Sequence, residues 1–182
     1  MSGLTRSAAC RMTVAVAVLA GIGACSSGNT AVAPRAWAKS VCAAVRPWSA
    51  EIKKLQSQAR KKISTRADVE RSKGELITLF AGMQMATEGA LKRVKDAGVP
   101  QVTGGRRIAD QFVHALAAAR DSFGTGMSAV QRLPTADQAA FYDGVVAAGD
   151  EMSKENNDAG RTFTKVTSPE LDRAFNEVPE CK

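Results

Sequence analysis

The chain has a single histidine, His114, and few aromatic residues, which make up 5% of its 182 residues. One histidine excludes the di-iron sites of ferritin-like bundles, which need Glu-x-x-His on two helices, and Gln111 stands three residues before His114. No nucleophile signature flanks His114. Helical periodicity places it opposite the apolar stripe of its segment, which predicts an exposed surface residue. We therefore expect a protein that is not an enzyme, with no catalytic residue, no metal site and no cofactor.

Long hydrophobic runs are also lacking. The apolar run over residues 13–24 is 12 residues long, whereas a membrane-spanning helix needs about 20. Arg6 and Arg11 are the only charged residues up to the end of this run, and small residues lead directly into Cys25. A basic start with a short apolar core is typical of a secretory signal peptide, and small residues before a cysteine resemble a bacterial lipobox.

This pattern predicts a signal peptide over residues 1–24, lipidation of Cys25 and a flexible tether over residues 25–35. Two alternatives stay open. Ala31-Val32-Ala33 fits the cleavage pattern of ordinary secretion, although it lies well beyond the apolar core. The apolar run could also stay uncleaved as an anchor, which its short length disfavours.

Cysteine is scarce, with four residues in the chain. Cys10 would leave with the signal peptide and Cys25 would be lipidated, so Cys42 and Cys181 remain. An even pair in an exported protein predicts a disulfide bond. The alternative is two free, buried thiols.

Beyond the tether, apolar residues recur with the helical period, and no run alternates with period two for long enough to predict a strand. The predicted helices cover residues 36–63, 66–97, 106–133, 135–166 and 169–178. Four long helices with short connections predict an all-α, up-down-up-down four-helix bundle with a short C-terminal helix, in one domain over residues 36–182. Trp37 and Trp48 lie on the apolar stripe of the first helix, so we expect both in the core.

Several residues predict where helices begin or bend. Pro47 predicts a kink or a restart in the first helix. Thr65 with Asp68, and Thr135 with Gln138, resemble capping boxes, while Ser168 precedes Pro169 as an expected N-cap.

Basic residues concentrate between Lys53 and Lys73, where eight Lys and Arg stand against two acids. The window surrounds the predicted turn between the first two helices. We expect a binding surface there that attracts an anionic envelope polymer or an acidic protein; its candidate residues are Arg60, Lys61, Lys62 and Arg66. Nucleic acid is not expected, because no aromatic residue interleaves the cluster to stack on bases. The alternative is a solvated turn without a partner.

Several short patterns occur together in this chain. They are the lipobox, Trp37, Cys42 and Trp48 on the first helix, Gly98-Val99-Pro100, Phe141-Tyr142-Asp143, Ser168-Pro169-Glu170-Leu171, Ala174-Phe175 and Val178-Pro179-Glu180-Cys181. Together they resemble the small helical lipoproteins that actinobacteria export. The resemblance implies an envelope protein anchored on the extracellular face of the cytoplasmic membrane, and it implies no catalytic residue.

Three classes of function follow from these observations. The favoured one is a non-enzymatic binding or scaffolding module held at the membrane by its lipid anchor. The second is a carrier of a small apolar or cationic ligand bound in or beside the bundle, and the third is a hydrolase of unrecognised chemistry. A carrier needs a concave apolar pocket of some hundreds of Å³, whereas a scaffold does not.

Overall fold

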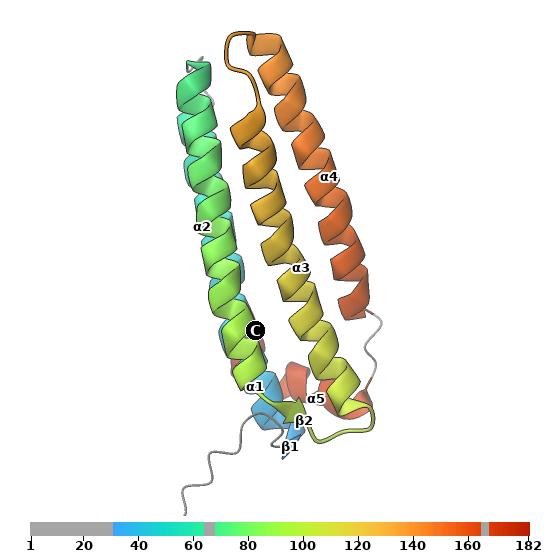
Figure 1. The fold of residues 1–182 in the computed structure, drawn as a ribbon. Helices are drawn as coiled ribbons and strands as arrows, with labels where there is room; N and C mark the ends of the chain where they lie inside the picture. The colour runs from blue at the N-terminus through green and yellow to red at the C-terminus, as the bar shows by residue number, and fades with distance from the viewer. Residues whose placement is uncertain (1–30, 64–67, 165–167) are drawn as a thin grey trace, which may run out of the picture.

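The computed structural model describes residues 31–63, 68–164 and 168–182, with the backbone alone over 155–164. The described chain is mostly helical and belongs to the all-α class, as predicted. Neighbouring helices in the sequence pack side by side: α1 on α2, α2 on α3 and α3 on α4, while α5 and η1 pack on α1 (Figure 1). The elements are β1 (Ala31–Val32), α1 (Pro34–Ile63), α2 (Val69–Asp96), β2 (Val99–Pro100), α3 (Gly105–Arg132), α4 (Gln138–Thr164), α5 (Pro169–Glu177) and the 3₁₀ helix η1 (Pro179–Cys181).

The structure differs from the expectation that no strand forms. β1 and β2 pair in parallel, with Ala31 opposite Val99 and Val32 opposite Pro100. The backbone N–H of Gln101 also donates to the carbonyl oxygen of Val32 at 2.8 Å. Part of the segment expected as a tether therefore docks against the connection between α2 and α3. Strands of two residues are too short to show an alternating pattern in a sequence.

Two of the predicted helix starts are wrong. Asp68 is itself the N-cap of α2, because its side chain accepts from the backbone N–H of Glu70, and Thr65 lies outside the described residues. At α4 the carboxylate of Asp137 accepts from the N–H groups of Ala139 and Ala140 at 2.9 and 3.1 Å. In both places an aspartate directly before the helix makes the cap, since its side chain reaches the first free N–H groups.

The remaining two helix signals have different outcomes. Ser168 caps α5 as predicted, accepting from the N–H of Leu171. The helix does not restart at Pro47, because α1 runs as one helix from Pro34 to Ile63. Pro47 and Ala43 are both exposed, so water can hydrate the carbonyl that loses its helical partner.

Trp37 is fully buried where the two ends of the described chain meet. Its ring meets Phe112 of α3 and Phe175 of α5 edge-on, with centroid distances of 5.2 and 6.0 Å. Its indole N–H donates to the carbonyl oxygen of Gly98 at 3.0 Å. Trp37 therefore joins α1 to α3, to α5 and to the turn that follows α2.

Trp48 is only half-buried, on the side of α1 that faces α2. Its indole N–H donates at 2.9 Å to the hydroxyl of Thr87, which is fully buried. The prediction of two core tryptophans is thus confirmed for Trp37 and met in part by Trp48.

Gly98 provides a test of this end of the fold. Its φ is 74°, a left-handed conformation that costs other residues roughly 1–2 kcal/mol, so Gly98→Ala should lower the free energy of unfolding by about that amount. The matched control is Gly74→Ala, because a Cβ at Gly74 meets nothing within 4 Å. That helical site should instead gain about 0.5–1 kcal/mol. Urea denaturation of both variants measures the difference, and equal effects would contradict the role of Gly98.

Candidate functional site

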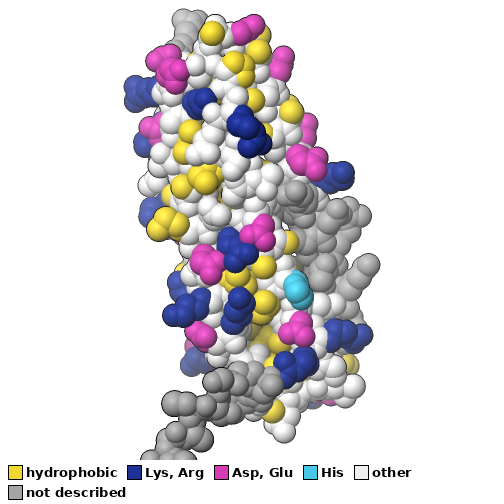
Figure 2. Space-filling model, in the orientation of Figure 1, with side chains coloured by type: hydrophobic (Ala, Val, Ile, Leu, Met, Phe, Trp, Pro, Cys, Tyr) yellow, Lys and Arg dark blue, Asp and Glu magenta, His cyan; other side chains and the backbone are white. Residues whose placement is uncertain are grey.

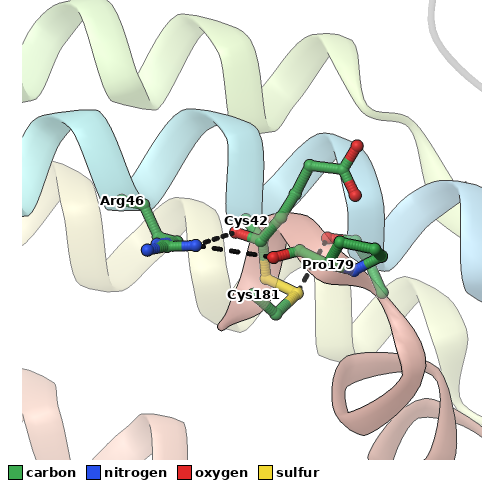
Figure 3. The surroundings of a disulfide bond; sticks show 6 residues. Cys42, Arg46, Pro179 and Cys181 are labelled. Atoms are coloured by element: carbon green, nitrogen blue, oxygen red, sulfur yellow. Dashed lines mark hydrogen bonds between the residues drawn. A yellow bond between two sulfur atoms is a disulfide. The ribbon is translucent and has the colours of Figure 1, made fainter.

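The two predicted disulfide residues are bonded to each other. Cys42 of α1 and Cys181 of η1 have Cα atoms 5.0 Å apart and lie 139 residues apart in the sequence. Figure 3 shows the bond between α1 and the last turn of the chain, with Arg46 beside it. Arg46 donates to the carbonyl oxygen of Glu180 at 3.3 Å. The prediction is confirmed, and the bond fastens the C-terminal turn to α1.

Charge supports the same contact. Lys39 of α1 lies 3.1 Å from a carboxylate oxygen of Glu180. The pKa of Glu180 is lowered from its ordinary value, first by a hydrogen bond from its own backbone N–H and then by the hydrogen bond from Lys39. Glu180 therefore stays ionised to a lower pH than a free glutamate, and the pair contributes to stability above that pH range.

Removing the disulfide should lower stability more than any surface change. In the chain-entropy model a closed loop of this length contributes about 5 kcal/mol, so Cys42→Ala/Cys181→Ala should lose up to that much in urea denaturation. A reducing agent should destabilise the parent protein and leave the double variant unchanged. Recovery of both cysteines as free thiols in non-reducing peptide mapping would contradict the bond.

The candidate basic residues lie at the opposite end of α1. Arg60, Lys61 and Lys62 form its last turn and are exposed, about 40 Å from Pro34 at 1.5 Å per residue. Arg66 and Cys25 lie outside the described residues. The two ends of the described chain, with β1, α5 and η1, are at the other end of the molecule (Figure 1).

Ion pairs reduce the basic charge of this end. Lys62 lies 2.8 Å from Glu75 of α2, and Lys54 lies 3.1 Å from Glu51 on its own helix. Both acids lie just outside the Lys53–Lys73 window in the sequence. The net positive charge counted over that window is therefore larger than the net charge of the surface these residues form.

Lys73 has a structural role. Its ammonium donates at 2.8 Å to the carbonyl oxygen of Leu133, the C-cap of α3. A cation at a helix C-terminus is favourable, because the free carbonyls there carry partial negative charge. Next to it, the hydroxyl of Thr135 donates to the carboxylate of Glu70, which ties α2 to the connection between α3 and α4.

Three of the other basic residues lie together on α1, and they form what we call the basic strip: Lys53, Arg60 and Lys61. With Gln56 and Ser57 they line a shallow depression of about 480 Å³. Spacings of seven and eight residues put these side chains on one face of the helix. In contrast, basic and acidic side chains are mixed on the α2–α3 face seen in Figure 2.

A second depression, which we call the apolar groove, adjoins the basic strip between α1 and α2. It has a volume of about 500 Å³, and Gln56 and Arg60 line both depressions. Its other lining residues are Ala59, Ile63, Leu76 and Leu79. Ile63 continues the apolar stripe of α1 four residues after Ala59, whereas Leu79 lies beside the stripe of α2. Sequence reasoning missed this groove, and an apolar residue beside a stripe is the signal that would have found it.

His114 is exposed, as predicted. Among the described residues, no cluster of three or more His, Cys, Asp or Glu side chains could hold a metal ion. Within the same part of the chain, none of the helices has the length and hydropathy needed to cross a membrane.

No protein-family model matches this chain, and neither a curated protein nor a solved structure is significantly similar to it.

Proposed function

We propose that the protein is a lipid-anchored lipoprotein on the extracellular face of the cytoplasmic membrane and acts there as a non-enzymatic binding module. The observation that carries this proposal is the short apolar run that ends in small residues and Cys25. An exported, oxidising environment is consistent with the Cys42–Cys181 bond. The resemblance to helical lipoproteins of actinobacteria supports the same location.

The four long helices form, in this proposal, an up-down-up-down bundle that presents the basic strip to the envelope. Short connections and side-by-side packing of consecutive helices support this arrangement. The anchor would join the chain at the end where β1 lies, so the strip would stand about 40 Å from the anchored end. Anionic envelope polymers or an acidic protein are partners of matching charge.

Lipidation is tested at the N-terminus itself. Mass spectrometry of the protein from membranes should find an N-terminal Cys25 with two or three acyl chains, which hold a protein stably on a membrane where one chain does not. Cys25→Ser should release the protein from the membrane fraction. An unmodified N-terminus at Pro34, or an intact signal peptide, would contradict the proposal.

Partner binding is tested by removing the charge of the basic strip. Lys53→Gln/Arg60→Gln/Lys61→Gln should reduce retention on purified cell wall, and retention of the parent should fall with rising salt because salt screens exposed charges. The matched control is Lys92→Gln/Arg93→Gln/Lys95→Gln, which removes the same charge from exposed residues near the other end of α2. Equal, salt-insensitive retention of all three proteins would overturn this function.

A second candidate function is a carrier of a small ligand. The apolar groove favours it, because a volume of about 500 Å³ lies in the range of small-molecule sites. The groove is open between two helices rather than enclosed in the core. A ligand there would lie beside the bundle, in contact with both α1 and α2.

A further inference from the structure

We propose that the apolar groove binds one long acyl chain whose carboxylate head meets the basic strip, so that the ligand is a free fatty acid. This inference rests on the carrier function above and names its ligand. It does not depend on the lipid anchor.

The lining of the groove determines the apolar part of the ligand. Ile63 of α1 and Leu76 and Leu79 of α2 are half-buried, so their remaining apolar surface is open to water. From Gln56 to Ile63 the groove follows α1 for about 10 Å, which is shorter than an extended long acyl chain, so such a chain would bind there bent. A volume of about 500 Å³ is of the size of one long acyl chain and smaller than that of two, which favours a single-chain ligand over a two-chain lipid. Covering this apolar surface with an acyl chain removes it from water, which favours binding.

Charge determines the head group. Arg60 lines both the groove and the strip, with Lys53 and Lys61 beyond it. Glu75 of α2, which directly precedes Leu76, lies 2.8 Å from the ammonium of Lys62. A cationic ligand, which the sequence left open, would be repelled by this border. An anionic head would be attracted, and a guanidinium can bind a carboxylate with two parallel hydrogen bonds.

Photo-crosslinking of the full-length protein in its native membranes tests the inference. The probe is palmitic acid bearing a diazirine, and the neutral comparator is hexadecanol bearing the same group. The acid should label peptides containing residues 56–63 and 76–79 more strongly than the alcohol does. Arg60→Gln should reduce labelling by the acid about tenfold, the value of one charge-assisted hydrogen bond.

Two further variants separate the apolar contribution from folding and from wall binding. Leu79→Gln should reduce labelling by both probes, whereas Met85→Gln should change neither, because Met85 of the same helix is 76% exposed and outside the groove. Leu79→Gln removes no charge, so salt-dependent retention on cell wall should persist in it. Loss of labelling together with normal wall retention separates this site from the proposed partner surface.

Three outcomes would overturn the inference. One is equal labelling by the acid and the alcohol in the parent protein. Another is labelling by the acid that maps outside α1 and α2, or that is unchanged in Arg60→Gln. Arg60 is exposed, so this substitution leaves the core intact. The third is stronger labelling of the groove by a diazirine-bearing phosphatidic acid, which would assign the site to a two-chain lipid.

Discussion

The burial of Trp37 is the constraint on which the rest of the structure depends. The side chain is inaccessible to solvent, and its single polar atom has a partner in the carbonyl of Gly98. Burial of the large aromatic ring is favourable, and the hydrogen bond avoids the cost of a buried, unpaired N–H. Gly98 lies in the turn after α2 and has a positive φ. Because Trp37 contacts both this turn and Phe175, its burial positions α1, the turn and α5 together.

The disulfide and the short sheet reinforce this same end. Cys181 is bonded to Cys42, the residue directly after the buried Val41, and β1 pairs with β2 next to the Gly98 turn. At the far end of the α1–α2 pair, α5 and η1 are absent and several apolar side chains remain half-buried. The molecule therefore has its disulfide and the contacts of Trp37 at one end and leaves accessible apolar surface at the other.

The sequence was sufficient for features that depend on periodicity or on counting. The helices follow from their apolar stripes, and the Cys42–Cys181 bond follows from the expectation of an exported chain with an even pair of cysteines. Ser168 was predictable as a cap because it directly precedes Pro169 at the first helical position. The two-residue strands were not predictable, because pairing so short leaves no pattern.

The helix caps and the groove show why the remainder needed the structure. Asp68 and Asp137 are the N-caps of α2 and α4, where the sequence pattern had favoured threonines. The hydroxyl of Thr135 instead donates to Glu70 of α2. Likewise, the groove arises only where two helices meet. Its lining residues come from segments that no local pattern connects, so only the packing of α1 on α2 brings them together.

The basic residues show most clearly how tertiary structure changes the meaning of a charge count. Lys54 and Lys62 are paired with glutamates, and Lys73 holds the end of α3, so part of the basic window serves the fold. Arg60 lies where the basic strip meets the apolar groove. A ligand at that border would gain both a charge contact, which salt weakens, and apolar burial, which salts such as sulfate strengthen. An ionic polymer would contact the strip alone and leave the groove uncovered, whereas an amphiphile would contact both surfaces.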